Sequence, residues 1–442
     1  MEIDENSILF MILVFAWIEY LWELYLSLRQ LKVYKTNNTI PEDLKDALSE
    51  ETFKKARLYG IDKSQYRIFR NFFSVIQTSF ILQQHWIYAV WALSERTGFY
   101  FGISRDREIM VSCIFITLVS LISFIINFPF TVYEAFVLEE KHGFNKQTVG
   151  FFIKDQLKML LLSLVIMIPV MAVTIYIVMI GGNMFVIWLW LFTTIVTVLL
   201  MMLYPNVIAP LFDKFVPLQE GNLRTGIENL ASKLDFPLGQ IYIVEGSKRS
   251  AHSNAYFAGL FGAKRIVLFD TLVEKYDEDK KEITGCTDKE ILGVLAHELG
   301  HWKLSHIYKS MCVTEINLFL MFAAFGFLFK YSLLYKALGF PAGQEPIIIG
   351  MVVIIQMILQ PYNSVLTYLL TVLSRKFEYE ADNFAISMNC HEELRSALVK
   401  LGKDNLDYPY YDALYSSWHH SHPTLLQRIE NIKALILNKK DK

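Results

Sequence analysis

The chain has 442 residues, of which 53% are hydrophobic and 14% aromatic, and its mean hydropathy is +0.32. A composition this apolar is unlike that of soluble globular domains and is typical of a protein with several membrane spans. The formal net charge of −2 excludes the strongly basic surface of a nucleic-acid-binding protein, so we expect no nucleic-acid partner.

Seven apolar stretches are long enough to cross the hydrocarbon core of a bilayer. They are predicted at Ile8–Tyr25, Phe72–Leu93, Ile109–Val132, Met159–Ile180, Phe185–Tyr204, Met311–Phe329 and Ile347–Leu373. The first is not a signal peptide, because acidic residues precede it where a signal peptide has basic ones. Polar residues within the spans, such as Glu19 and Glu23, are expected to face a bundle interior or a water-filled cavity. Hydrogen bonding between helices is an equally good interpretation of each of them.

Basic residues are distributed unevenly between the connections. Segments 26–70 and 135–156 hold ten and three Lys or Arg residues, whereas segments 95–106 and 330–346 hold two each. The excess predicts that the odd-numbered connections and the C-terminus are cytosolic. The paired lysines before the last two residues also match a dilysine signal for retrieval to the endoplasmic reticulum, although a solvated basic tail explains them equally well.

This pattern predicts four parts of the chain. Residues 1–204 hold five membrane helices with cytosolic loops, and residues 205–310 form a cytosolic segment. Residues 311–373 hold the sixth and seventh membrane helices, and residues 374–442 form a C-terminal cytosolic segment. The second and fourth parts therefore lie on the same side of the membrane.

Two short strands are predicted in the polar segment 205–310. Gln240–Val244 and Arg265–Phe269 are rich in β-branched and aromatic residues, and the stretch Ser253–Gly259 lies between them. A strand edge beside a catalytic site can hold a peptide by adding it as a further strand.

The same segment contains an H-E-x-x-H motif, His297-Glu298-Leu299-Gly300-His301. The preceding residues begin with acidic side chains and continue with an apolar face, which predicts that the motif lies within a helix. On a helix the two histidines share one face and can bind one metal ion, and Glu298 can take a proton from an activated water. The alternative is two surface histidines on an amphipathic helix.

A third ligand is required, because catalytic zinc sites use three protein ligands and keep one position open. His306 is the nearest candidate, but Leu304 and Ile307 stand where the longer metzincin motif requires glycine and histidine. We therefore interpret His306 as a polar residue near a membrane boundary. Cysteine ligation is not expected either, because the four cysteines are scattered without a C-x-x-C pair, which also argues against a disulfide framework.

The better candidate lies downstream, in the run Ser374–Asp382. Glu378 and Asp382 are four residues apart and share a helix face. Glu378 could complete a site with two histidines and one carboxylate, and Asp382 could accept the free N–H of a ligand imidazole. Glu380 points elsewhere on the same helix and is the weaker choice of ligand.

Three further histidines, His419, His420 and His422, lie near the C-terminus. Peptide hydrolysis places negative charge on a tetrahedral intermediate, and a histidine N–H aimed at that oxygen stabilises it. The spacing does not indicate which of the three has this role, and a loop with structural histidines is an equal alternative.

Taken together, these motifs resemble those of the CaaX prenyl protease 1 family, the Ste24-type integral membrane zinc proteases. The resemblance is carried by His297–His301, Ser374–Asp382 and Ser253–Phe257, and further by Glu139–Asn145 and Tyr204–Phe212. It extends over essentially the whole chain.

The resemblance implies a mainly α-helical multi-span membrane protein. Seven transmembrane helices would enclose a chamber, capped by a gluzincin-like zinc metalloprotease domain with a small β-sheet. Members of the family remove the aaX tripeptide from farnesylated or geranylgeranylated CaaX proteins, and some make a second, upstream cleavage. The expected partners are thus prenylated CaaX proteins and the lipid bilayer. We expect a monomer in the endoplasmic reticulum membrane, and also in the inner nuclear membrane, with the active site facing the cytosol or nucleoplasm.

The resemblance also assigns the metal site. It implies one Zn²⁺ per chain, bound by His297, His301 and Glu378, with Glu298 as the general base of peptide hydrolysis.

Four further residues match functional positions of the family. Asp382 matches a carboxylate that holds a ligand imidazole, and His422, in a Ser-His-Pro context, matches the transition-state histidine. Asn254 and Ala255 match residues that contact the substrate.

Two other interpretations deserve comparison. A quality-control protease of the bacterial HtpX type shares the zinc motifs, but it has fewer spans and lacks the long N-terminal half of this chain. A seven-span transporter or scaffold with an inert metal-like motif is the second alternative. The presence of Glu298 argues against it, because an inert scaffold has no need of a catalytic base.

Overall fold

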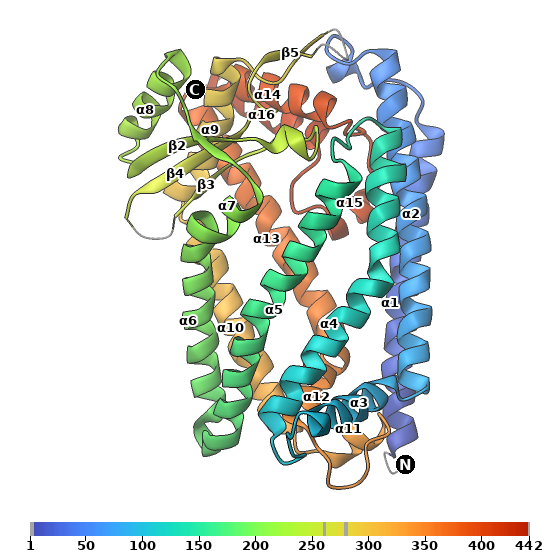
Figure 1. The fold of residues 1–442 in the computed structure, drawn as a ribbon. Coiled ribbons are helices and arrows are strands. Elements are labelled where there is room, and N and C mark those ends of the chain that lie inside the picture. The colour runs from blue at the N-terminus through green and yellow to red at the C-terminus, as the bar shows by residue number, and fades with distance from the viewer. Residues whose placement is uncertain (1–3, 260–261, 278–281, 441–442) are drawn as a thin grey trace.

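The computed structural model describes residues 4–259, 262–277 and 282–440. These parts of the chain are mainly helical, with one sheet of four strands and one of two. Long helices make up most of the length of the molecule (Figure 1). Short helices close the end that holds the N-terminus, and the sheets with their covering helices lie at the opposite end, near the C-terminus.

Most of the long helices are apolar enough to span a membrane. The long helices are α1 Glu5–Thr36, α2 Glu50–Gln83, α4 Glu108–Tyr133, α5 Val149–Ile180, α6 Phe185–Leu203, α10 His306–Leu328 and α13 Gln360–Ser387. Among the described residues, five segments meet the length and composition of a span: Glu5–Thr36, Glu108–Glu139, Val149–Ile180, Gly182–Phe212 and His306–Leu328. They include the short segments η2 Glu134–Glu139, η3 Gly182–Met184, η4 Tyr204–Ile208 and α7 Ala209–Phe212. The chain is therefore a multi-pass membrane protein, and these five segments coincide with five of the seven predicted spans.

The predicted span Phe72–Leu93 is not continuous. Helix α2 ends at Gln83, and α3 (Trp86–Tyr100) begins after His85, which has a left-handed conformation with φ 49°. A residue in this region ends the regular hydrogen bonding of a helix. Helix α3 consequently turns aside and packs against α4 at the N-terminal end of the molecule (Figure 1).

The predicted span Ile347–Leu373 is bent. It consists of α12 Ile347–Val352, η6 Val353–Ile358 and the first part of α13, and its two halves meet at an angle of 59° at Leu359. Pro361 explains the break, because proline has no N–H for the helix and its ring clashes with the preceding turn. If the bent pair is one span, the described residues hold up to six candidate spans.

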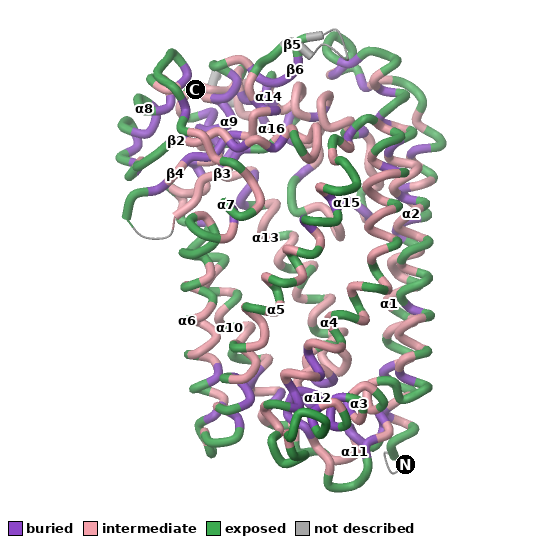
Figure 2. Tube along the Cα trace, in the orientation of Figure 1, coloured by how far each residue is buried: buried purple, intermediate pink, exposed green. Residues whose placement is uncertain are grey.

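Buried residues are concentrated at the two ends of the molecule, and few lie along the middle of the long helices (Figure 2). A cavity of about 760 Å³ lies among α1, α2, the bent pair and the C-terminal histidines. Glu19 and Glu23 line it, and they also bond other helices: Glu19 accepts from Ser364 at 3.1 Å and Glu23 accepts from Trp418 at 3.0 Å. Glu19 and Glu23 therefore do both of the things expected of them: they face a cavity, and they form hydrogen bonds between helices.

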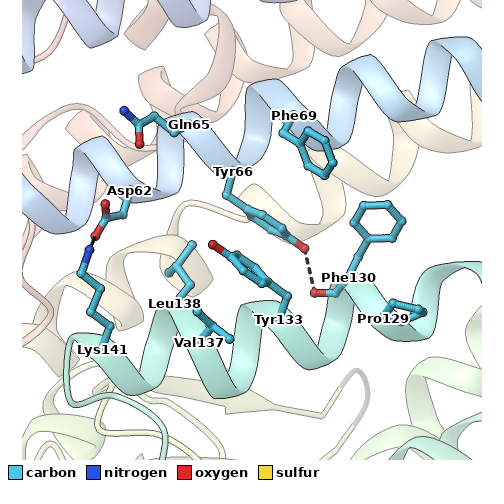
Figure 3. Close-up of a pocket in the computed structure, with 10 residues that line it drawn as sticks. All are labelled: Asp62, Gln65, Tyr66, Phe69, Pro129, Phe130, Tyr133, Val137, Leu138 and Lys141. Carbon is cyan, nitrogen blue, oxygen red and sulfur yellow. Dashed lines mark hydrogen bonds and ion pairs between the residues drawn. The ribbon is translucent and has the colours of Figure 1, made fainter.

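A second hollow, of about 470 Å³, lies between α2 and the segment formed by α4 and η2 (Figure 3). The rings of Tyr66 and Tyr133 stack in it at 5.4 Å, and the Tyr66 hydroxyl donates to the carbonyl oxygen of Phe130 at 2.8 Å. An ion pair of 2.6 Å joins Asp62 to Lys141 at one end. These contacts hold α2 against the neighbouring span.

The four-stranded sheet confirms both predicted strands. Its order is β1-β2-β4-β3, with β2 and β4 parallel and the outer pairs antiparallel. The strands are β1 Phe215–Pro217, β2 Leu238–Val244, β3 Ala255–Ala258 and β4 Lys264–Phe269, and the small second sheet is β5 Lys275–Asp277 with β6 Glu282–Thr284. Strand β3 lies at the sheet edge and contacts the helix of the H-E-x-x-H motif.

The remaining helices cover this sheet and close the ends of the molecule. They are η1 Glu42–Leu44, α8 Asn222–Lys233, η5 Gly246–Lys248, α9 Asp288–Lys303, α11 Ser332–Lys336, α14 His391–Asp404, α15 Ala413–His419 and α16 Leu425–Lys440. The apolar faces of α8, α9, α14 and α16 form one buried cluster with the sheet.

Helix α9 is fixed by its cap and by two glycines. Thr287 caps its first turn, and Glu290 returns a bond to the Thr287 backbone N–H. A Cβ at Gly293 would lie 2.7 Å from the backbone of Leu394, and one at Gly300 would lie 3.1 Å from Phe384. The two glycines therefore let α9 approach α14 and α13 closely, which brings residues 297–301 beside α13.

Candidate metal centre

Three side chains from two helices converge on one point. His297 and His301 lie one turn apart on α9, and their Nε2 atoms are 3.2 Å apart. Glu378 of α13 places one carboxylate oxygen 3.4 Å from His297 Nε2 and the other 3.3 Å from His301 Nε2. These three residues offer ligand atoms that all lie within 4.8 Å of one another, as a single metal ion requires.

The tautomer of His297 is set by its other ring nitrogen. His297 Nδ1 lies 2.8 Å from Asp382 Oδ1, and the Asp382 side chain is fully buried. Because an ionised carboxylate only accepts hydrogen bonds, a neutral His297 carries its proton on Nδ1 and leaves a lone pair on Nε2. Arg428 of α16 donates to both oxygens of Asp382 and keeps that carboxylate charged.

The donor set fits a divalent cation. Two imidazole nitrogens and one carboxylate are the ligands of one common class of catalytic zinc site. Within the described parts of the chain the buried Glu378 Oε2 atom has no hydrogen bond, and its charged neighbours are His297 Nε2 at 3.4 Å and Arg428 Nη1 at 3.8 Å. Such an atom is costly to bury unless something else satisfies it, and a cation shared with the two histidines would do so.

Glu298 lies beside this group and faces a cavity of about 540 Å³. The cavity is lined by residues of β3, α6, α9, α10 and α13, among them His301 and Tyr256. Burial raises the pKa of the Glu298 carboxyl above its ordinary value of 4.5. A raised pKa makes the carboxylate a stronger base, which suits proton abstraction from water.

The C-terminal histidines separate in space. His422 Nε2 lies 3.3 Å from Glu378 Oε1, and its side chain is 64% exposed. His419 and His420 instead line the interior cavity near Glu23. Of the three, His422 has the contact with the candidate ligands.

Asn254 and Ala255 lie at the start of the edge strand β3. The Asn254 side-chain oxygen accepts from the Ala255 backbone N–H at 2.8 Å, and its backbone oxygen accepts from Phe269 at 3.0 Å. The cavity beside Glu298 is lined by the next two residues of the strand, Tyr256 and Phe257. Contact of Asn254 and Ala255 with a substrate stays a prediction.

Sequence reasoning missed Arg428 and undervalued His306. Arg428 lies 46 residues beyond Asp382 on a separate helix, and no local motif marks it. His306 does lie at a boundary, as the first residue of the candidate span His306–Leu328, but it is 3% exposed and contacts His301, which its place at a span boundary does not indicate. Its position five residues after His301 was the only available signal.

Comparison with known proteins gives two family matches. Residues 30–214 match the CAAX prenyl protease N-terminal region with five membrane helices, and residues 217–436 match peptidase family M48.

Full-length relatives and a solved structure agree with these matches. The CAAX prenyl protease 1 homolog of Homo sapiens is 44% identical, covering 98% of this chain and 96% of the relative. The CAAX prenyl protease 1 of Saccharomyces cerevisiae is 34% identical, covering 97% of this chain and 95% of the relative. The crystal structure of S. mikatae Ste24p is similar with a TM-score of 0.88 and 33% identity, covering 98% of this chain and all of that one.

Replacement of Arg428 by alanine is expected to destabilise the protein by about 3–5 kcal/mol, because it leaves the buried Asp382 carboxylate without its cation. Arg428→Lys should restore only part of the loss, since one ammonium group cannot reproduce the two-pronged contact. Arg224→Ala is the matched control, because Arg224 is partly exposed and pairs with the exposed Glu220 and Glu228, so its loss should have little effect. Thermal unfolding in detergent micelles measures the difference, and equal midpoints for both alanine variants would contradict the prediction.

Proposed function

The chain belongs to peptidase family M48, in its CAAX prenyl protease 1 branch, and from this premise we propose that it is a zinc endopeptidase that removes the C-terminal aaX tripeptide from prenylated CaaX proteins. The observation that carries the proposal is the convergence of His297, His301 and Glu378, with Glu298 facing the adjoining cavity. These are the ligands and the base that amide hydrolysis by activated water requires.

We assign a step to each side chain. When bound, zinc would polarise the scissile carbonyl and acidify the attacking water. Glu298 takes the proton from that water and passes it to the leaving amine. The His422 ring donates to the oxyanion that forms on the substrate carbonyl. Asp382, supported by Arg428, keeps His297 in the tautomer that can bind metal.

Selectivity for a lipid-bearing tail is assigned to apolar surface around the site. The cavity beside Glu298 includes Met201 of α6 and Ile307 and Met311 of α10, both of which are candidate membrane spans. Each CH₂ group of a prenyl chain buried there contributes roughly 0.8 kcal/mol. The edge strand β3 beside the cavity offers backbone groups that can pair with the extended peptide. A second, upstream cleavage would use the same centre.

The architecture that we propose has seven spans around an interior chamber, with the gluzincin-like cap on the cytosolic side. Helix α2, which runs beside α1 (Figure 1), is one of these seven spans, although its composition is more polar than that of the other spans. The 760 Å³ cavity is then part of the chamber. We also propose that the chain is divided into the four parts 1–204, 205–310, 311–373 and 374–442. We propose a monomer, located in the endoplasmic reticulum and inner nuclear membranes.

Glu298→Gln is expected to keep one zinc ion per chain and to lower kcat by roughly 100- to 10,000-fold, because it removes the base and leaves the three ligands in place. His301→Ala is the comparison, since it should lose both metal and turnover. Metal analysis of the purified protein, together with cleavage of a prenylated peptide, tests both. A Glu298→Gln enzyme with full activity would exclude this mechanism.

Matched farnesylated and unmodified CaaX peptides are expected to be cleaved at the same bond, after the modified cysteine, with a higher kcat/KM for the farnesylated peptide. The zinc ligands do not contact the lipid, so the preference for the farnesylated peptide must come from the apolar surface of the cavity beside Glu298. Product masses and steady-state kinetics on the pair measure it. Cleavage at scattered apolar sites regardless of the lipid would instead support a quality-control protease.

Asn37, in the sequon Asn37-Asn38-Thr39, is expected to remain unglycosylated in cells, because the connection after α1 is assigned to the cytosol. Gly102→Asn serves as the control, since it creates a sequon with Ser104 in the opposite connection. Glycosidase treatment followed by mass measurement reads both sites. A glycan that disappears in Asn37→Gln would reverse the proposed orientation.

A further inference from the structure

A second histidine lies against the candidate ligand His301. His301 Nδ1 and His306 Nδ1 are 2.9 Å apart, and His306 Nε2 is 3.0 Å from Glu380 Oε2. The three side chains thus form a continuous line of contacts from α13, through the first residue of α10, to α9. No step of the proposed hydrolysis uses His306 or Glu380.

The contacts allow one arrangement of protons for a metal-binding His301. Because the Glu380 carboxylate only accepts, His306 Nε2 must carry a proton. A neutral His306 then has Nδ1 as its acceptor, so the proton between the two Nδ1 atoms belongs to His301. His301 Nε2 is left with a lone pair, and this is the atom that faces Glu378 at 3.3 Å.

The pair is held rigidly. The His306 ring is 3% exposed and stacks on Phe377 with centroids 4.1 Å apart and planes 7° from parallel. Ser305, directly before it, has a left-handed φ of 59°, so the chain turns sharply between α9 and α10. Glu380 is half-buried, and its other near partner is the exposed Lys376 at 3.8 Å. The stacked ring cannot turn away from His301 without losing its packing.

We propose that His306 and Glu380 are a positioning pair that fixes His301 in the tautomer able to bind the metal. They hold the proton of His301 on Nδ1, as Asp382 holds the proton of His297 on Nδ1. Without Glu380, His306 is free to carry its proton on Nδ1 and donate to His301. The proton of His301 then moves to Nε2, and that atom can no longer bind a cation. The inference rests on the proposed metal site and adds the support of its second histidine.

The test measures Zn²⁺ affinity of the full-length protein in detergent micelles, by competition with a fluorescent chelator. Glu380→Ala is expected to weaken Zn²⁺ binding by roughly 10- to 100-fold, as is usual for partners of metal-bound histidines. Glu380→Gln should bind close to wild type, because its amide oxygen still accepts from His306. Lys376→Ala, the matched control, removes only the exposed partner of Glu380 and should also bind as wild type does.

A double-mutant cycle that combines Glu380→Ala with His306→Phe separates the positioning of His301 from the packing of the His306 ring. Phenylalanine keeps a ring stacked on Phe377 but has no nitrogen, so it should weaken Zn²⁺ binding as much as Glu380→Ala does. The double variant should be no worse than either single one, because the two residues act through one contact. The absorption spectrum of Co²⁺-loaded protein should change in both single variants, while the unfolding midpoint of the metal-free protein stays constant.

Three results would overturn the inference. They are wild-type Zn²⁺ affinity in Glu380→Ala, a Glu380→Gln variant as weak as Glu380→Ala, or a loss that follows the unfolding midpoint of the metal-free protein. If the wild-type chain itself binds no Zn²⁺, the proposed function fails together with the inference. If the wild type binds Zn²⁺ and Glu380→Ala binds it equally well, the inference alone fails.

Discussion

The burial of the Asp382 carboxylate is the constraint on which the site depends. A charge with no solvent contact is tolerated only when it is paired and fully hydrogen-bonded. Here the partners are Arg428 of α16 and His297 of α9, so one carboxylate ties together three helices that lie far apart in the chain. The C-terminal helix thereby supports the candidate metal centre without supplying one of its candidate ligands.

Helix α13 arranges this chemistry through its periodicity. Glu378 and Asp382 share the face toward α9, where the first approaches the Nε2 side of the imidazoles and the second the Nδ1 side of His297. Glu380 lies between them in sequence and reaches a different neighbour, His306 at the start of α10. One regular helix therefore places carboxylates on both sides of the histidine pair. The close approach of α9 at Gly300 keeps the distances short.

Local spacing explains which features could be predicted from the sequence. The H-E-x-x-H helix, the Glu378–Asp382 face and strands β2 and β4 depend on patterns of four to ten neighbouring residues, and the structure has each of them. Arg428 and the contact of His306 with Glu380 depend on how distant helices pack, which no short pattern records. Strand β3 is only four residues long, and its pairing with β4 decides its conformation. The break after Gln83 lies at the polar residues Gln84 and His85, which the prediction of a continuous span places inside a membrane helix.

The order of elements along the chain limits how this candidate centre can be handled. Between His301 and Glu378 the chain runs through α10, turns, and returns through the bent pair into α13. No cut in the sequence therefore separates the chemistry from the hydrophobic helices, and a water-soluble fragment with both halves of the centre cannot be excised.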